Sequence, residues 1–115
     1  MPLKKSTREQ IRPVVPKLIA LIEEVVYPDI WERPELAKRD RSLVTIAALI
    51  CLRQTEQLRL HLELGLANGL TADEISELIT HTAIYAGFPA ANSAAVAALP
   101  VFKELGLIDS DSSTS

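Results

Sequence analysis

Residues 71–86 read TADEISELITHTAIYA, and this stretch carries the clearest structural signal in the sequence. Thr71 and Glu74 form a capping box: the threonine oxygen accepts a hydrogen bond from the N–H of Glu74, and the carboxylate accepts one from the N–H of Thr71. A helix therefore begins here, and the Gly-Phe-Pro segment at 87–89 ends it. Apolar spacing predicts a buried face made of Ile75, Leu78, Ile79 and Thr82, and another face carries Glu77, His81 and Tyr85.

Two more helices are expected before this one, because the same apolar spacing recurs upstream. The nearer helix covers about residues 54–68 and stops at Gly69, a residue that favours helix C-termini. Its inward residues are Leu58, Leu62, Gly65 and Leu66. The other helix begins at Leu36 or Arg39 and ends near Leu52. It has two apolar stripes, which predicts a central and mostly buried helix. These stripes are Leu43, Ile46, Ala47 and Ile50, and then Val44, Ala48 and Cys51.

The outer parts of the chain add one helix at each end. Residues 16–28 are predicted to form a one-faced helix. Its apolar face consists of Leu18, Leu21, Ile22 and Val25. Residues 89–105 form an alanine-rich helix, which Pro100 is expected to kink or restart. Residues 1–12 are polar without an apolar stripe, and residues 109–115 are expected to be a disordered tail.

The length and the pattern together predict a single all-α domain. A chain of 115 residues has room for one core. No run alternates with the period of two that is typical of strands, so the expected architecture is about five helices over residues 1–115. A core of Ala, Leu, Ile and Val suits closely packed helices. Because a chain this small gains stability from an oligomeric interface, we expect self-association.

Charge and composition argue against several classes of partner. The formal net charge is -3 and no Lys/Arg cluster exceeds Lys4-Lys5, so nucleic acid is not an expected partner. No apolar run reaches the ~18 residues that span a bilayer, and no signal-peptide pattern is present, so we expect no membrane association and a cytoplasmic location. The single Cys51 cannot form an internal disulfide, which suits a reducing compartment, and it is expected to be an inert buried thiol.

Four segments carry a resemblance to a known family. They are WERPEL at 31–36, RSLVTIA at 41–47, a stretch at 55–71 that begins TEQLRLH and ends GLT, and HTAIYAGFPA at 81–90. The last resembles the tyrosine-alanine-glycine-x-proline signature of the carboxymuconolactone decarboxylase family. The resemblance extends over residues 31–92. It implies an alkylhydroperoxidase-D-like helical bundle that assembles into a ring, commonly a homohexamer with a trimer possible. It also implies a cofactor-free decarboxylation of 4-carboxymuconolactone in aromatic catabolism.

The same superfamily offers an alternative chemistry. Alkylhydroperoxidase-D-like proteins use a Cys-x-x-Cys-x-x-x-His redox centre. With its histidine placed on His61, the two cysteine positions fall on Gln54 and Gln57, so both sulfurs are absent. Cys51 lies one helical turn too early. A thiol peroxidase or disulfide reductase is therefore disfavoured, and a non-catalytic, ring-forming binding protein is the other alternative.

The decarboxylation implied by the resemblance needs a positioned acid and a donor to the developing oxyanion. The electrons left by carbon dioxide flow into the conjugated lactone carbonyl, and the anion is then protonated on carbon. His61 is the expected acid, and a structural core histidine is the alternative reading. Glu56 is expected to orient His61 from a neighbouring subunit or turn, with a surface glutamate as the alternative. This reaction needs no metal and no cofactor.

Four further residues are candidates for substrate binding. Gln57 lies one turn before His61. Arg41 suits bidentate binding of a substrate carboxylate, and the alternative is pairing with Asp40, Glu35 or a carboxylate of a partner.

The last two candidates, His81 and Tyr85, share a helical face. They either form hydrogen bonds to the lactone or line a subunit interface. Trp31 is interpreted as a packing or interface residue. Two histidines without clustered carboxylates make a poor metal site, so no bound metal is expected.

Overall fold

A computed structural model describes residues 5–109 of the chain. Within that range the regular structure is entirely helical and contains no strand, which confirms the all-α prediction. Six α-helices occur, together with a π-helical turn and a 3-10 turn. In chain order the elements are α1 (Lys5–Ile11), α2 (Pro16–Leu21), η1 (Ile22–Val26), η2 (Ile30–Glu32), α3 (Lys38–Cys51), α4 (Thr55–Ala67), α5 (Ala72–Ala86) and α6 (Phe88–Glu104).

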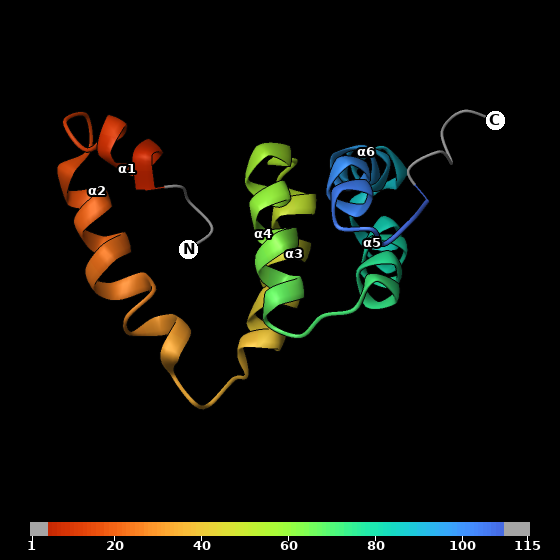
Figure 1. Ribbon diagram of the computed structural model, residues 1–115, viewed down its shortest axis with the longest axis horizontal. Coiled ribbons are helices and arrows are strands. Elements are labelled where there is room, and N and C mark those ends of the chain that lie inside the picture. The colour runs from red at the N-terminus through yellow and green to blue at the C-terminus, as the bar shows by residue number, and fades with distance from the viewer. Residues whose placement is uncertain (1–4, 110–115) are drawn as a thin grey trace.

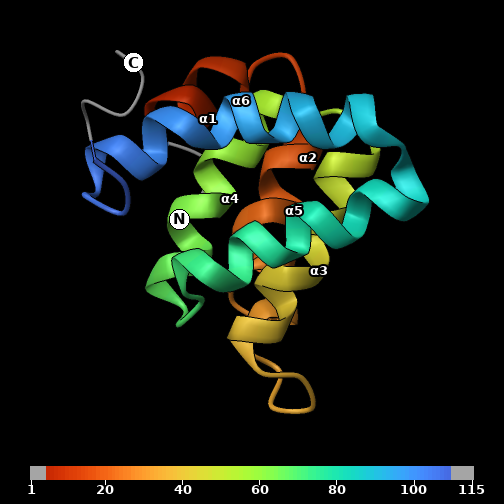
Figure 2. The same cartoon turned by 90° about the vertical axis from the view of Figure 1, so that its right-hand side faces the viewer.

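The elements form two parts that meet at the loop before α3 (Figure 1). The first part, which we call the arm, contains α1, α2, η1 and η2. The second, which we call the bundle, contains α3 to α6. In the bundle, α3 packs on α4 and α5 packs on α6, and α6 also contacts both α3 and α4. Figure 2 shows α5 and α6 crossing in front of α3 and α4. Helices α4 and α5 make no substantial direct contact.

The core lies inside the bundle and is built from aliphatic side chains and alanine. Ile46, Leu62 and Ile75, from three different helices, are fully buried. Removing each such side chain from water contributes about 1.5–3 kcal/mol to folding. Helix α6 contributes mainly small residues, which let its axis lie close to its neighbours. These are Ala90, Ala94, Ala97 and Ala98, followed by Val101.

The predicted capping box is present at the start of α5. The N–H of Thr71 donates to Oε1 of Glu74 over 2.9 Å, and the N–H of Glu74 donates to Oγ1 of Thr71 over 3.1 Å. The same glutamate also accepts a hydrogen bond from Arg39, at the beginning of α3. The backbone hydrogen bond from Thr71 and the charge of Arg39 lower the pKa of the Glu74 carboxyl. The first turns of α3 and α5 are therefore joined.

The helix ends around α4 and α5 also agree with the sequence. Gly69 has a φ of +108° and Gly87 a φ of +100°, and both values disfavour residues with a Cβ. Helix α6 continues through Pro100 as a single helix, so it does not restart at this residue. Pro100 lies about one turn before the end of α6, so the missing N–H removes only one backbone hydrogen bond of a 17-residue helix.

The arm contains a helix that the polar sequence of residues 1–12 did not predict. Helix α1 is held by charges rather than by an apolar stripe. Arg12 binds both carboxylate oxygens of Glu23, in η1, over 3.0 and 2.8 Å. Arg8 is only 4% exposed and lies 3.5 Å from the same carboxylate. The predicted tail at 109–115 lies outside the described residues, apart from Asp109.

Two predicted buried stripes lie on the surface instead. In the arm, Leu18 is 51% exposed and Leu21 is 40% exposed, whereas Ile19 between them is fully buried. In α3, Val44 is 63% exposed and Cys51 is exposed, so the thiol is not the buried group expected. Each helix buries only the face that meets another helix of this chain. No helix in the described range is long and apolar enough to cross a membrane.

Candidate active site around His61

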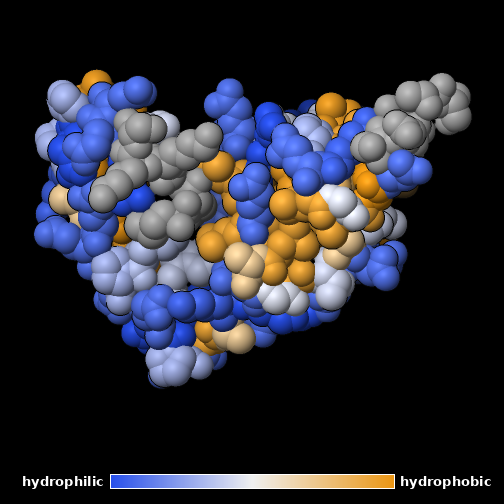
Figure 3. All heavy atoms as spheres, in the orientation of Figure 1, coloured by the Kyte–Doolittle hydropathy of each residue, from blue (hydrophilic) through white to orange (hydrophobic). Residues whose placement is uncertain are grey.

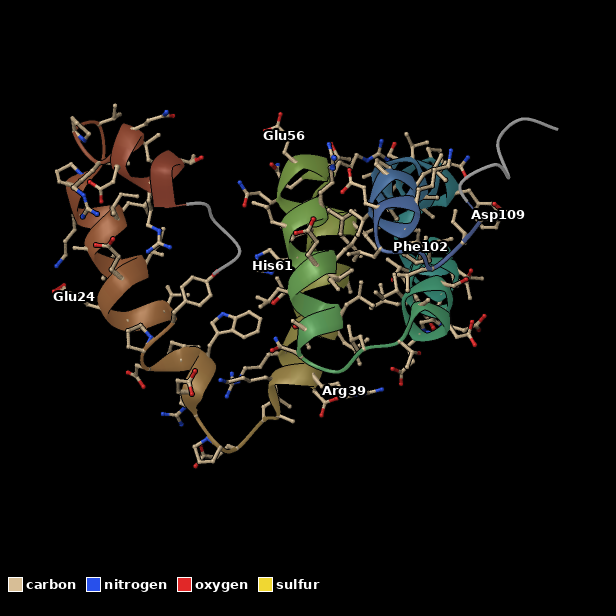
Figure 4. All side chains as sticks on the ribbon, in the orientation of Figure 1. Glu24, Arg39, Glu56, His61, Phe102 and Asp109 are labelled. Carbon is tan, nitrogen blue, oxygen red and sulfur yellow. The ribbon has the colours of Figure 1, made fainter. Side chains whose placement is uncertain are left out.

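His61 projects from α4 toward the arm (Figure 4). Its helix anchors it, because Leu58, Leu62 and Gly65 on the adjoining face are buried in the core. The imidazole is 9% exposed and is stacked on the indole of Trp31, with ring centroids 6.2 Å apart and an interplanar angle of 25°. Trp31 stacks in turn on Tyr27, at 6.0 Å and 25°. We call Tyr27, Trp31 and His61 the aromatic stack.

The Nδ1 atom of His61 is buried and has no hydrogen-bond partner among the residues that the structure describes. Leaving a buried polar atom unpaired costs about 1–3 kcal/mol, so such atoms are rare outside functional sites. Burial also lowers the pKa of His61, so the ring is mostly neutral at pH 7. This imidazole is thus desolvated, and one of its nitrogens is unpaired within the described chain.

Arg41 clamps the loop that connects the arm to the bundle. Its Nε donates to the carbonyl of Leu36 and its Nη2 to the carbonyl of Arg33, both over 3.1 Å. Pairing with Asp40 or Glu35, the alternative considered from the sequence, is not what the structure has. Asp40 accepts from Arg39 over 3.1 Å, and Glu35 lies 3.8 Å from Arg33. Because η2 directly precedes this loop, Arg41 helps to fix the position of Trp31.

Glu56 and Gln57 lie at the start of α4 and are both exposed. Glu56 lies near the N-terminal end of α4 and points away from His61 (Figure 4). No hydrogen bond joins the two, so the structure does not bring them together within one chain. Both residues line a surface pocket of about 540 Å³, whose wall also includes Arg59, Glu63 and Glu104. An orienting role for Glu56 from a neighbouring subunit stays a prediction.

His81 and Tyr85 lie on the outer face of α5, with ring centroids 5.4 Å apart. Both are exposed, Tyr85 by 78%. His81 lines a groove of about 580 Å³ between α3 and α5. Because α5 does not pack directly on α4, these two residues are not neighbours of His61 in the same chain. The predicted site residues therefore occupy three separate places on one subunit.

Sequence analysis did not connect Trp31 and Tyr27 with His61. Trp31 was interpreted as a packing or interface residue, and its packing partner is the candidate catalytic ring. Tyr27 was not singled out. Tyr27 is partly buried, and this burial raises the pKa of its hydroxyl. Aromatic residues make up only 4% of the chain. Because they are so scarce, the occurrence of Tyr27 and Trp31 four positions apart was a signal in the sequence that could have marked them as site residues.

The described residues contain no group of three or more His, Cys, Asp or Glu side chains that could hold a metal ion.

The surface chemistry of the bundle differs from that of the arm. Hydrophobic residues gather on the bundle face that Figure 3 shows, while the arm on the same side is mostly hydrophilic. The protein is thus a helical bundle with one buried, ring-stacked imidazole between its two parts.

Comparison with known proteins agrees with this description. The model of the carboxymuconolactone decarboxylase family matches residues 16–100, and the chain belongs to that family. The chain is 46% identical over 86 residues to 4-carboxymuconolactone decarboxylase of Acinetobacter baylyi, an alignment that covers 75% of this chain and 64% of the relative. It is 38% identical over 69 residues to nitrosuccinic acid decarboxylase npaB of Metarhizium robertsii, covering 60% of this chain and 48% of that protein. The matches therefore span less than two thirds of either relative.

Proposed function

We propose that this chain is a cofactor-independent decarboxylase, a carboxy-lyase, that acts on a small carboxylated lactone such as 4-carboxymuconolactone in aromatic-compound catabolism. One observation carries the proposal: His61 is buried and stacked with the indole of Trp31, and no described group of the protein forms a hydrogen bond with its Nδ1 atom. A structural histidine of the core would have its ring nitrogens paired within the protein. An imidazole with a free nitrogen suits proton transfer to a bound molecule.

The reaction balances with His61 as the only proton carrier. The bond between the ring carbon and the carboxylate breaks, and carbon dioxide leaves. The electron pair moves through the conjugated double bond to the lactone carbonyl, which forms a furanolate-like anion. The imidazolium of His61 then gives its proton to a ring carbon, which yields the neutral enol-lactone and a neutral imidazole. Solvent restores the proton for the next cycle.

The lowered pKa of His61 has a direct consequence for this scheme, because the acid must be charged when it acts. A substrate carboxylate brings a negative charge close to the ring, and this favours the imidazolium. At about 4 Å and an effective dielectric constant of about 20, such a charge contributes about 4 kcal/mol. One pKa unit corresponds to about 1.4 kcal/mol, so binding of the anion acts against the effect of burial on the pKa of His61. His61 then becomes an acid only in the complex.

The two relatives support the decarboxylase class on chemical grounds. Their names specify a carboxylated lactone and a nitro acid as substrates. In both molecules an electron-withdrawing group receives the electron pair that carbon dioxide leaves, and the charge develops on oxygen. Decarboxylation with oxyanion stabilisation is the step they share. We place this chain in that class and take the lactone as its substrate, because the lactone enzyme is the more similar of these two relatives.

We further propose that the working form is a homohexamer, with a trimer as the simpler alternative, in the cytoplasm. The arm presents apolar side chains that the described residues leave partly exposed, with Leu18 at 51%, Leu21 at 40% and Val25 at 39% exposure. Their spacing of three and four residues is that of one helical face, and a second copy of the chain would bury it. Contacts between copies could also bring Glu56 toward His61. The substrate-binding roles of Arg41, Gln57, His81 and Tyr85 belong to this proposal.

The assembly is tested by light scattering coupled to size-exclusion chromatography. A mass near six or three subunits is expected, and Leu18→Glu should reduce it. Lys17→Glu is a matched control, because Lys17 is exposed on the same helix outside the apolar stripe. A monomer at all concentrations would contradict the assembly.

The activity is tested by incubating the purified chain with 4-carboxymuconolactone while ultraviolet absorbance and carbon dioxide release are measured. Turnover is expected, and His61→Gln should lower kcat by about 10²–10⁴-fold, the usual contribution of an acid catalyst. Glu24→Gln is the control, because Glu24 is exposed on the arm and points outward in Figure 4. Full activity of His61→Gln would remove His61 from the mechanism. Absence of turnover with the lactone and with nitrosuccinic acid would contradict the proposed function.

A further inference from the structure

The indole of Trp31 is stacked with the His61 ring, with ring centroids 6.2 Å apart and ring planes inclined by 25°. Trp31 is the only tryptophan in the sequence. It is held from both sides along the chain: Tyr27 stacks on it from the end of η1, and the loop that follows it is clamped by Arg41. The indole of Trp31 is therefore held in place by its neighbours and is not a freely moving surface side chain.

The ring of a catalytic histidine is usually oriented by a hydrogen bond to the nitrogen that does not react. That device is absent here among the described residues, because neither ring nitrogen of His61 forms a hydrogen bond with any of them. The contact that fixes the plane of the imidazole is the stack with Trp31. We propose that Trp31 is the positioning residue of His61, which sets the orientation of the imidazole through ring stacking in place of a hydrogen bond. This inference rests on the proposed function of His61 as the acid.

None of the charged groups described near the aromatic stack orients the imidazole of His61. Tyr27 is stacked with Trp31, and Arg8 from α1 acts on Tyr27 rather than on His61. On α4 itself, Glu56 and Glu63 are exposed and form no described bond to the imidazole. Burial is the cause that lowers the pKa of His61. A change of ring at position 31 should thus alter the surroundings of His61 without removing a charge.

The first experiment tests the contact without any substrate. A protonated imidazole in contact with an indole quenches its fluorescence, so the emission of Trp31 should fall as pH is lowered through the titration of His61. The midpoint should lie below the ordinary value of about 6.5. His61→Gln should abolish the transition. His81→Gln is the matched control, since His81 is the only other histidine and should leave the transition in place. A transition that persists in His61→Gln would overturn the inference.

The second experiment separates positioning from a merely structural role. Trp31→Phe keeps an aromatic ring over the imidazole, and Trp31→Leu keeps only bulk. We expect Trp31→Leu to lower kcat by about 10-fold to 100-fold, the usual effect of a misplaced catalytic group, with KM changed less than about threefold. Trp31→Phe should recover most of that loss. The pKa of His61 in both variants is read from its ring protons by NMR, and only Trp31→Leu should move it clearly toward 6.5.

The outcomes distinguish this inference from the proposed function. Equal kcat in Trp31→Leu and the wild type, or equal losses in both variants, would overturn the positioning role. If the wild type has no decarboxylase activity, the proposed function fails on the substrate assay, whereas the fluorescence and NMR titrations still report whether the indole fixes the imidazole. Thermal melting followed by circular dichroism excludes misfolding, and Trp31→Phe provides the folded aromatic reference if Trp31→Leu does not fold.

Discussion

Asn68 donates a hydrogen bond of 3.0 Å from its Nδ2 to the Oγ of Ser42. Ser42 lies in α3 and is fully buried, while Asn68 is the C-terminal cap of α4. The bond thus ties the end of one helix to the beginning of another, 26 residues away along the chain. It also satisfies a hydroxyl that has no access to water.

Removing the side-chain amide of Asn68 alone should therefore destabilise the protein more than removing both partners of this hydrogen bond. Asn68→Ala leaves the Ser42 hydroxyl unpaired and should destabilise the protein by about 1–3 kcal/mol. The double variant Ser42→Ala with Asn68→Ala should lose less than the sum of the two single changes. Urea unfolding measures all four proteins of this cycle. Simple additivity would show that the bond contributes nothing.

Gly65 should not tolerate a side chain, although it lies in the middle of a helix where alanine is intrinsically favoured. A Cβ at this position would meet Cδ1 of Leu70 at 2.9 Å and Cδ1 of Ile46 at 3.2 Å. We expect Gly65→Ala to cost about 1–3 kcal/mol by overpacking, against a gain of about 1 kcal/mol in helix propensity. In a Leu70→Ala background the added methyl group should stabilise instead, as measured by urea unfolding. A stabilising Gly65→Ala in the wild-type background would contradict this close approach.

Arg41 offers a test between substrate binding and loop clamping. Arg41→Lys keeps the positive charge but loses the fork that reaches two carbonyl groups at once. If the clamp is its main role, Arg41→Lys and Arg41→Ala should both change the emission of Trp31, and both should lower kcat. If the charge binds the substrate carboxylate, Arg41→Ala should raise KM by about 10-fold or more, and Arg41→Lys should raise it less. Steady-state kinetics with fluorescence of the free protein separates the two.

The stability of the fold should fall at mildly acid pH because of His61. Its folded-state pKa is lowered, so between that value and the unfolded value of about 6.5 the unfolded chain binds more protons. The stabilisation is complete above pH 6.5 and is lost as pH falls below it, by at most about 1.4 kcal/mol per pH unit. The carboxyl groups of Glu23 and Glu74, whose pKa values are also lowered, act only in a more acid range.

Urea unfolding at pH 7.5 and 5.5 checks this expectation. The wild type should lose more stability between these two values than His61→Gln does. His81→Gln should behave as the wild type, because His81 is exposed. Equal losses in the wild type and His61→Gln would contradict a buried, neutral imidazole.

Local signals were enough to predict most of the bundle. The capping box at Thr71 and the glycines at 69 and 87 mark the boundaries of α4 and α5 correctly, because caps act through neighbouring backbone groups. Apolar spacing also identified Leu58, Leu62 and Gly65 as buried residues of α4, whereas Leu66, predicted to face inward with them, is only partly buried. These features depend on residues within one or two helical turns, and a single sequence contains that information.

The arm was predicted less well, because its structure depends on partners distant in sequence. Helix α1 is stabilised by pairing of Arg12 with Glu23, which periodicity cannot reveal. The apolar stripe that begins at Leu18 is typical of a core face, yet no helix within residues 5–109 covers it. The site shows the same limit. His61 could be selected from its motif, but its stacking on Trp31 joins residues 30 positions apart and follows from the path of the connecting loop.

Because Cys51 is exposed, the distance between the arm and the bundle can be measured by fluorescence energy transfer. The chain has one tryptophan, on the arm, and one cysteine, at the end of α3 in the bundle. A dye attached to this accessible thiol would accept excitation energy from the indole, and the transfer efficiency would report the separation of the two parts in the unaltered sequence.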